Sequence, residues 1–597
     1  MKNYSARKFF FQRDIIYMSE IDLGVVDLDY MQKYNQWVQN KYFDADTIAQ
    51  LKNIAGDDKE IRERFYKDLE FGTGGLRGII GAGTNCINKY TIRKATQGLA
   101  DFINKTVDSG KRCVAIAYDS RLFSKEFARE TALVLNANDI KTYLFCELTP
   151  TPVLSFAVRY LKCCCGIVIT ASHNPKEYNG YKVYWKDGAQ VTSPVDSQIV
   201  ECVNKITSFD QIKLIDEEIS IEKGLFNIIG DDVYNAYIEA IKKQRVHLDT
   251  PHDLKIVYTP LNGSGNKLVR RILKETCFEN VAVVAEQELP DSNFTTIGVP
   301  NPEYPQAFKL ALELASKKNA DIILGTDPDS DRIGVVVNDN GDYKYLTGNM
   351  TGVLLCEYIL SQKKSLGILP ANPVIISTLV STKLAKKIAA SYDAEYIEVL
   401  TGFKYICREI RNFEGKKNFV FGFEESYGYL AGIHSRDKDA IVAAMLICEM
   451  ADFYKSQGLT LIDALDNIYK KYGCQKEILN SLELKGIDGL VQMQNIMANL
   501  RNNPPSDICD IKIKSISDFT SSTKINSAGE KSFLVLPKSD VIFFELEDDS
   551  WICIRPSGTE PKIKIYVGAC AQNVFDADDK LKMLLDGFKK YACGDLL

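Results

Sequence analysis

Three stretches of the chain repeat one order of hydrophobic and polar positions: an apolar run, a turn, a helical run and a second apolar run. Short continuous apolar runs are typical of strands buried on both faces of a parallel sheet. Each stretch therefore predicts a β-strand–helix–β-strand unit, and their spread along the chain favours three α/β domains in series over one large sheet. The expected elements are Cys113–Tyr118, Ser124–Ala137 and Lys141–Phe145; Lys255–Tyr258, Gly265–Leu273 and Val281–Val284; and Val374–Ser377, Ser381–Ala390 and Tyr396–Val399.

Breaks in this pattern predict where the domains end. Residues 1–60 have the pattern of a helical extension, Thr207–Lys223 is polar and acidic without a strong period, and Asn502–Asp507 is a cluster of turn formers at or near the start of the last domain. We therefore expect four domains: 1–215, which includes the extension, 216–340, 341–470 and 471–597.

Composition narrows the class of protein. Of 597 residues, 45% are apolar and 25% charged, as in ordinary globular proteins, and the net charge of −6 provides no positive field for nucleic acid or anionic lipid. The apolar run Ala440–Cys448 is about half the length that spans a bilayer. Sixteen cysteines are too dilute for a disulfide scaffold and suit a reducing compartment. We expect a cytoplasmic enzyme that binds neither nucleic acid nor membrane; nothing indicates an oligomeric state.

The loop Thr170–Pro175 follows the predicted strand Gly166–Ile169 and consists of small and polar residues closed by proline. Such a loop presents a hydroxyl group on a tight turn, so Ser172 is a candidate nucleophile or phosphate carrier. The alternative is an ordinary turn in which serine and asparagine satisfy the backbone of the loop.

Three aspartates follow the predicted strand Asp321–Leu324, and their carboxylates at Asp327, Asp329 and Asp331 can converge on one hard cation. An EF-hand is excluded, because Arg332 and Asn338 stand where that loop needs glycine and glutamate. The short set of protein ligands favours Mg²⁺, whose shell phosphate oxygen often completes. A solvated acidic turn is the alternative.

Three further loops carry weaker signals. Arg555–Lys562 combines an arginine fork with small residues and can clamp a phosphate, or it is a turn bounded by prolines. Gly422–Gly428 can bind sugar hydroxyls, or it is a charged loop before a helix. Phe71–Gly78 lacks the third glycine of a dinucleotide-binding motif. Together the loops favour phosphoryl transfer between sugar hydroxyls, which needs positioning and charge neutralisation.

The segments TASHNP, DPDSDR, GFEESYG and RPSGTEPK, in this order, resemble the α-D-phosphohexomutase family from about residue 60 to about residue 590. The versions FGTGGLRG and TASHNPKEYNGYKVYW resemble the branch that holds bacterial phosphoglucomutases and the eukaryotic phosphoglucomutase-2 group. The resemblance implies an α/β fold of four domains around a central cleft, with three related α/β domains and a distinct α+β C-terminal domain.

The resemblance also implies roles for individual residues. Ser172 is expected to carry the phosphate, with Lys182 as general acid or base and Arg77 and His173 in the catalytic set. Mg²⁺ is expected on Asp327, Asp329 and Asp331 together with the phosphate of Ser172. Phe403 departs from the histidine that some members carry. The expected substrate-binding residues are Thr401, Gly402, Glu424, Ser426, Arg436, Lys438, Arg332, Arg555, Ser557, Gly558 and Thr559.

The activity that the resemblance implies is interconversion of glucose 1-phosphate and glucose 6-phosphate, through phosphoserine and bound glucose 1,6-bisphosphate. The domain that carries Arg555 is expected to hinge over this substrate. Phosphopentomutase or phosphomannomutase activity by the same mechanism is the nearest alternative. A non-catalytic module that binds phospho-sugars or a partner, and a metal-dependent phosphatase, are the alternatives from other classes.

Overall fold

The computed structural model describes residues 30–594, apart from 73, 248–250, 485 and 557–561. The chain forms two compact units, each described by itself. The first contains residues up to Asn235 together with Asn262–Ser264 and Leu289–Pro300, and the second contains the remainder. In the described part of the chain, no helix has both the length and the apolar character needed to cross a membrane.

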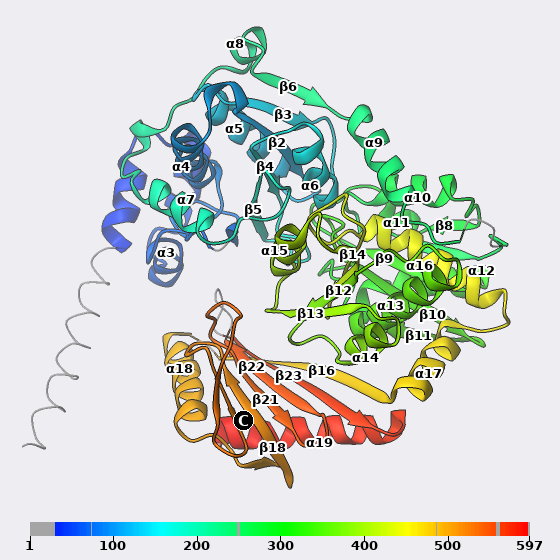
Figure 1. Cartoon of the computed structure of the whole chain (residues 1–597). Coiled ribbons are helices and arrows are strands. Elements are labelled where there is room, and N and C mark those ends of the chain that lie inside the picture. Colours follow the sequence, from blue (N-terminus) through cyan, green and yellow to red (C-terminus); the bar gives the residue numbers. More distant parts are fainter. Residues whose placement is uncertain (1–29, 73, 248–250, 485, 557–561, 595–597) are drawn as a thin grey trace, which may run out of the picture. The chain divides into compact units, whose positions relative to one another are not determined.

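The first unit is built on a six-stranded sheet in the order β1-β5-β4-β2-β3-β6. Strands β4, β2, β3 and β6 are parallel, whereas β5 runs antiparallel to β4 and to β1. Helices cover both faces (Figure 1). The elements are β1 (Gly75–Ile79), α4 (Lys89–Thr106), β2 (Cys113–Tyr118), α5 (Ser124–Asn136), β3 (Lys141–Phe145), α6 (Thr151–Tyr160), β4 (Cys165–Ile169), β5 (Tyr178–Trp185), α7 (Val195–Asn204), α8 (Glu217–Glu222) and β6 (Phe226–Ile229).

Two features of this unit refine the expected boundaries. The described part of the N-terminal extension is helical, over residues 30–39, α2 (Ala45–Asn53) and α3 (Asp58–Phe65), and packs through aromatic side chains that include Trp37 and Phe65. At the other end, β6 pairs with β3, so the first sheet extends beyond residue 215. The side chain of Ile228 in β6 is 58% exposed, and a short edge strand with an exposed face leaves little hydrophobic pattern.

The second unit contains two smaller α/β sheets, in the orders β11-β10-β9-β7-β8 and β13-β12-β14-β15. Helix α9 (Asp231–Lys242) leads into it. The first sheet has β7 (Ile256–Thr259), α10 (Asn266–Glu275), β8 (Val281–Val283), α11 (Ala285–Glu288), α12 (Lys309–Lys318), β9 (Ile322–Thr326), β10 (Ile333–Asp339) and β11 (Asp342–Leu346). The second has α13 (Gly348–Ser365), β12 (Pro373–Thr378), α14 (Leu384–Ser391), β13 (Glu395–Val399), α15 (Phe403–Phe413), β14 (Asn418–Glu424), β15 (Gly428–Ala431), α16 (Ala440–Lys455) and α17 (Leu461–Tyr472).

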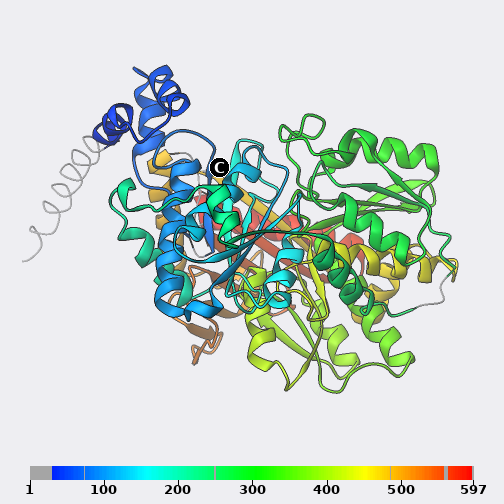
Figure 2. The same cartoon turned by 90° about the horizontal axis from the view of Figure 1, so that it is seen from above.

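The three sheets share one internal order, which confirms the three predicted β-strand–helix–β-strand units. In each sheet two parallel strands joined by a helix lie beside a third parallel strand, and an antiparallel strand follows that third strand directly. Figure 2 shows the three sheets by colour, from blue and teal through green to yellow-green. The repeated orders are β3-β2-β4-β5, β8-β7-β9-β10 and β13-β12-β14-β15.

The C-terminal domain differs in architecture from the three α/β domains, as expected. Its sheet is antiparallel, and α19 lies along the sheet (Figure 1) and packs on β23 and β16. The core between them is made of isoleucine, leucine and phenylalanine side chains such as Ile554, Leu584 and Phe588. The elements are β16 (Cys474–Glu483), α18 (Gly486–Asn502), β17 (Asp507–Ile508), β18 (Ile511–Asp518), β19 (Thr523–Asn526), β20 (Lys531–Phe533), β21 (Ile542–Leu546), β22 (Trp551–Pro556), β23 (Lys562–Ala571) and α19 (Val574–Cys593).

Candidate functional site

The hairpin loop between β4 and β5 holds Ser172 in a defined and unusual backbone conformation. Ser172 has φ of +53°, in the left-handed region, and its side chain is almost fully buried. Its N–H donates to Oγ1 of Thr170 at 2.7 Å, and that hydroxyl donates to Oδ2 of Asp119 at 2.6 Å. The Oγ atom of Ser172 lies 3.1 Å from Nδ1 of His173. The loop is therefore fixed from its backbone, while the hydroxyl lies next to an imidazole.

Arg121, which the sequence did not single out, anchors this loop from the neighbouring strand. It follows β2, whose carboxyl end lies beside that of β4, and its side chain is buried with that of Asp119, at 3.4 Å between Nε and Oδ2. A guanidinium group has five N–H donors in a rigid plane, so it can hold several carbonyls at once. It donates to the carbonyl oxygens of Ser172 at 2.6 Å, Asn174 at 2.5 Å, Pro175 at 2.8 Å and Tyr178 at 3.0 Å.

Arg77 and Lys182 lie on one face of the antiparallel pair β1–β5. Gly75 pairs with Lys182 and Arg77 with Gly180, and residues opposite one another in a sheet share a face. Nη1 of Arg77 donates to Oδ1 of Asn174 in the serine loop at 3.3 Å. Gly75, at φ +141°, could not be replaced, because a Cβ atom there would lie 1.7 Å from the carbonyl oxygen of Tyr181. Two cationic side chains are thus placed on β5, which follows the Ser172 loop, and on β1, which pairs with β5.

The hairpin loop between β9 and β10 brings the three predicted aspartates together. Asp327, Asp329 and Asp331 are all buried, with carboxylate oxygens within 4.8 Å of one another. Burial, and then the charges of Asp329 and Asp331, raise the pKa of Asp327 well above its ordinary value. A buried cluster of carboxylate oxygens that repel one another fits a hard divalent cation such as Mg²⁺.

Lys438 joins this acidic loop to the hairpin loop after β14. Its Nζ lies 3.1 Å from Oδ2 of Asp331, 3.3 Å from Oδ1 of Asp437 and 4.0 Å from Oε1 of Glu424. Burial lowers the pKa of Lys438, but these carboxylates outweigh it and raise the pKa well above the ordinary value. Burial raises the pKa of Glu424 to about 7, although Lys438 and Arg332 partly oppose it. The carboxylate and the ammonium group therefore belong to one buried charge network.

The arginines predicted to bind substrate in this unit make different contacts. Nη1 of Arg332 donates to Oε1 of Glu303 at 2.7 Å, and Arg332 is held at the end of the acidic loop. Arg436 is buried and donates to the carbonyl oxygen of Ile433 at 2.5 Å and to Oε1 of Glu414 at 3.0 Å. The guanidinium group of Arg436 thus holds the loop that carries Lys438, a role that the sequence did not indicate.

The second predicted sugar loop contacts the same network through Phe403. Gly402 has φ of +117° and precedes α15, with Thr401 half-buried beside it. Nζ of Lys438 lies 5.8 Å from the centre of the Phe403 ring, a cation–π contact. Phe403, which stands where the resemblance implies histidine in some family members, therefore supports Lys438 here. Ser426 is half-buried, and its Oγ donates to Oε1 of Glu425 at 3.4 Å.

In the C-terminal domain, Arg555 lies at the end of β22 and pairs with Lys564 of β23. Burial and the charge of Arg555 lower the pKa of Lys564, whereas burial raises the pKa of Glu425 and the charge of Arg555 partly opposes that rise. Lys564 is thus a cation beside Arg555 that the sequence did not single out, although it lies two residues after the RPSGTEPK segment. The predicted ligands Ser557, Gly558 and Thr559 lie outside the described residues.

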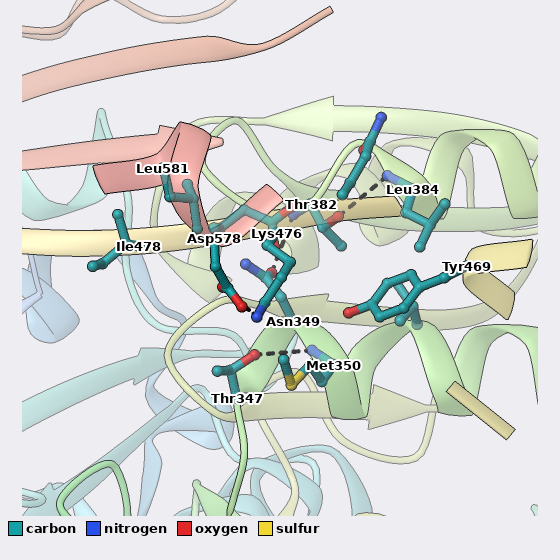
Figure 3. A pocket seen from close by; sticks show the side chains of 13 residues that line it. Thr347, Asn349, Met350, Thr382, Leu384, Tyr469, Lys476, Ile478, Asp578 and Leu581 are labelled. Carbon is teal, nitrogen blue, oxygen red and sulfur yellow. Dashed lines mark hydrogen bonds and ion pairs between the residues drawn. The ribbon is translucent and has the colours of Figure 1, made fainter. Parts of the chain in front are cut away.

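A separate pocket of about 230 Å³ lies where β16 leaves the third α/β domain (Figure 3). None of the described residues predicted for the site lines it. Lys476 forms an ion pair with Asp578 at its wall, and the half-buried residue Glu477 lies next to them. Burial raises the pKa of Glu477 to about 7, although hydrogen bonds from the side chains of Thr382 and Asn349 oppose the rise. This pocket therefore places a titratable carboxyl group at the entry to the C-terminal domain.

Comparison with known protein families shows which family the chain belongs to. Four domain models of phosphoglucomutase/phosphomannomutase match in order: α/β/α domain I over residues 68–210, domain II over 235–341, domain III over 347–472 and the C-terminal domain over 522–576. The chain belongs to the phosphoglucomutase/phosphomannomutase family. The resemblance found in the four sequence segments is confirmed.

Relatives within the phosphoglucomutase/phosphomannomutase family match nearly end to end. A phosphoglucomutase of Staphylococcus epidermidis is 37% identical over 535 residues, 89% of this chain and 96% of the relative. A phosphoglucomutase of Staphylococcus aureus is 39% identical over 533 residues, which cover 88% of this chain and 94% of the relative.

Solved structures agree with the four-domain fold of the family. The open form of parafusin, a phosphoglucomutase from Paramecium, is 18% identical and covers 89% of this chain and 96% of its own, with a TM-score of 0.66. A family protein from Burkholderia thailandensis is also 18% identical and covers 88% of this chain and 98% of its own, with a TM-score of 0.64. At this identity the likeness shows the fold alone.

Proposed function

We propose that the protein is a phosphoglucomutase that interconverts glucose 1-phosphate and glucose 6-phosphate, with Ser172 as the phosphate carrier. The observation that carries the proposal is the buried cluster of Asp327, Asp329 and Asp331, which suits a divalent cation and a phosphate group. Membership of the family supports a phosphosugar mutase, and the staphylococcal relatives named phosphoglucomutase support the glucose substrate.

In the first transfer, the free hydroxyl of the sugar monophosphate attacks the phosphorus of phosphorylated Ser172. The new P–O bond forms to the sugar as the P–O bond to Ser172 breaks, so the serine oxygen leaves with the electron pair. Lys182 accepts the proton of the attacking hydroxyl and passes a proton to the departing oxygen of Ser172, and in the reverse step it takes the proton of Ser172 and gives one to the sugar oxygen. The product is a sugar bisphosphate, glucose 1,6-bisphosphate, which gives its other phosphate back to Ser172.

Charge on the transferring phosphate must be neutralised while this happens. Asp327, Asp329 and Asp331, together with the phosphorylated side chain of Ser172, would hold Mg²⁺, which would supply that positive charge. Arg77, Arg332 and His173 are proposed as donors to the same phosphate.

The sugar and its second phosphate need their own contacts. Glu424 is proposed to bind sugar hydroxyls because its carboxylate is buried in the loop that Lys438 joins to the acidic cluster. Lys438 and Arg555 supply cations for the phosphate that does not react. Thr401, Gly402, Ser426, Arg436, Ser557, Gly558 and Thr559 complete the proposed substrate set. We also propose a cytoplasmic location, which the free thiol form of all sixteen cysteines supports.

The deciding experiment is a mutase assay on the full chain with Mg²⁺ and a trace of glucose 1,6-bisphosphate. Glucose, mannose and ribose 1-phosphates are compared, free phosphate is monitored, and Ser172→Ala is assayed alongside. We expect conversion of glucose 1-phosphate that Ser172→Ala abolishes. Preference for ribose or mannose 1-phosphate would change the substrate but keep the mechanism, rapid release of free phosphate would indicate a phosphatase, and no turnover would favour a binding module.

A further inference from the structure

Cysteine side chains gather at the amino ends of β2 and β4, the end of the sheet opposite to Ser172. Cys113 begins β2, and Cys163 and Cys164 immediately precede β4. The N–H of Cys164 donates to the carbonyl oxygen of Cys113 at 3.0 Å, which sets the two strands in register there. Cys163 directly precedes Cys164 in the chain, so Cys113 and Cys163 are neighbours at this end of the sheet.

The two thiols differ in exposure and are already in contact. Cys113 is half-buried and can be reached from solvent, whereas Cys163 is only 2% exposed. The side chains of Cys163 and Cys113 share a hydrogen bond, and Sγ of Cys113 lies 3.7 Å from the carbonyl oxygen of Lys162, the residue before Cys163. One sulfur is therefore accessible, and the other is held against it out of solvent.

The surroundings of Cys113 favour its thiolate. The hydrogen bond from Cys163 lowers the pKa of Cys113 to about 7, and the charge of Lys141, which faces Cys113 from β3, acts in the same direction. The charge of Arg112 acts to lower the pKa of the neighbouring Cys164, which burial raises. The same hydrogen bond, together with burial, raises the pKa of the Cys163 thiol. An accessible thiolate beside a protonated thiol is the arrangement of a reactive and a resolving cysteine.

We propose that Cys113 and Cys163 form a peroxide-reactive dithiol, in which hydroperoxides oxidise Cys113 and Cys163 resolves it to a disulfide. This site is independent of the proposed phosphoryl transfer, because it lies at the amino ends of the strands whereas Ser172 follows the carboxyl end of β4. Its substrate class is a hydroperoxide, with hydrogen peroxide as the simplest member.

The reaction balances in two steps. The thiolate of Cys113 attacks one peroxide oxygen, the S–O bond forms as the O–O bond breaks, and the second oxygen leaves as water or alcohol after taking a proton. The sulfur of Cys163 then attacks the sulfenic acid, the S–S bond forms, and the hydroxyl group leaves as water with the proton of the Cys163 thiol. The two thiols lose two electrons together, and the peroxide gains them.

The test treats the reduced full chain with hydrogen peroxide and measures its mass and its disulfide-linked peptides. We expect the loss of two hydrogen atoms, a peptide that joins Cys113 to Cys163, and reversal by dithiothreitol. Separately, alkylation of Cys113 by iodoacetamide should have its midpoint near pH 7, where the exposed residues Cys146 and Cys277 serve as internal standards for reagent access.

Two variants make the assignment falsifiable. Cys163→Ala should stop at a sulfenic acid on Cys113 that dimedone traps, whereas the matched control Cys164→Ala should still form the bridge. A bridge from Cys113 to Cys164, peroxide reaction at Cys146 or Cys277 before Cys113, or an alkylation midpoint for Cys113 near its ordinary value would each overturn the proposal. Because the readouts are mass and alkylation, they do not depend on mutase activity.

Discussion

The Nζ atom of Lys438 lies 3.1 Å from Oδ2 of Asp331, so the aspartate loop and the loop after β14 are joined by a buried ion pair. Lys438 also reaches Asp437 and Glu424 and lies over the ring of Phe403. The lysine therefore neutralises part of the acidic cluster when no other cation is bound. A divalent cation on the aspartates has to compete with this ammonium group for the same carboxylate.

Lys438→Met is expected to destabilise the protein without metal and to increase the stabilisation by Mg²⁺. Removing one member of a buried ion pair costs about 3–5 kcal/mol, because the remaining charges lose their partner. Mg²⁺ would then restore more stability to the variant than it adds to the wild type. Thermal unfolding in EDTA and in excess Mg²⁺ measures both effects.

Lys344→Met is the matched control, because Lys344 pairs with Asp339 on the surface of the same domain. We expect its melting temperature to respond to Mg²⁺ as the wild type does. An equal response of Lys438→Met and Lys344→Met would show that Lys438 does not compete with the cation.

Arg121→Lys is expected to lower kcat by about 100-fold with little change in KM, because a small displacement of a reacting group has that effect. A lysine cannot donate in the plane to all the carbonyls that Arg121 holds, so the Ser172 loop would lose its fixed geometry. Steady-state kinetics measures the effects on kcat and on KM separately. Arg129→Lys, which alters an exposed pair with Glu217, is the control and should leave kcat unchanged. Equal losses in both variants would remove the positioning role of Arg121.

Ser172→Gly and Ser172→Ala should both lose mutase activity but differ in stability. The φ of +53° at residue 172 is accessible to glycine without strain, whereas a Cβ atom costs about 1 kcal/mol there. We therefore expect a higher melting temperature for Ser172→Gly than for Ser172→Ala. Equal melting temperatures would mean that the loop relaxes out of the left-handed conformation when the hydroxyl is removed.

Glu477→Gln is expected to be more stable than the wild type at alkaline pH, by a larger margin than at acid pH. The pKa of Glu477 is raised to about 7 in the folded protein, above its ordinary value, so its contribution to stability is complete below pH 4.5 and is lost as pH rises through 7. The glutamine variant does not lose stability in this way. Its free energy of unfolding, relative to that of the wild type, should therefore increase by at most about 3 kcal/mol between pH 5 and pH 8. Thermal unfolding of both proteins across this range measures it.

Glu545→Gln provides a control of opposite sign. Burial acts to raise the pKa of Glu545, but hydrogen bonds from Lys524 and Ser515 outweigh it and lower the pKa. The wild-type residue therefore stabilises at neutral pH and loses this contribution as pH falls. If both variants changed with pH in the same direction, the pKa of Glu477 would not be raised by its surroundings.

The sequence predicted the strands of the three α/β units well because each is a continuous apolar run, and it predicted the aspartate loop because three carboxylates two residues apart are a local pattern. The sequence did not indicate the role of Arg121, and the reason is physical. Its role depends on β2 lying beside β4, and the lateral order of strands is set by packing between distant segments rather than by local pattern.

Other misses have related causes. Lys564 pairs with Arg555 across two antiparallel strands, so its place depends on the register of the C-terminal sheet. Arg436 is predicted to bind phosphate as an arginine beside Lys438, and in the structure it also donates to the carbonyl oxygen of Ile433 and to Glu414, contacts that depend on the fold. Residue type and spacing therefore indicated which loops matter, whereas the structure distinguishes side chains that face the site from those that hold it.

The shared order of the three α/β sheets has a consequence for how this chain evolves. Ser172, Ser330 and Tyr427 each adopt a left-handed conformation in the hairpin loop after the third parallel strand of their own sheet. One ancestral unit, copied twice within a gene, would carry the same left-handed corner three times. Each copy was then free to specialise its corner, because a change in one hairpin leaves the cores of the other two sheets unaltered. Substitutions after β14 can therefore alter that hairpin loop while the serine and aspartate loops of the other two sheets keep their structure.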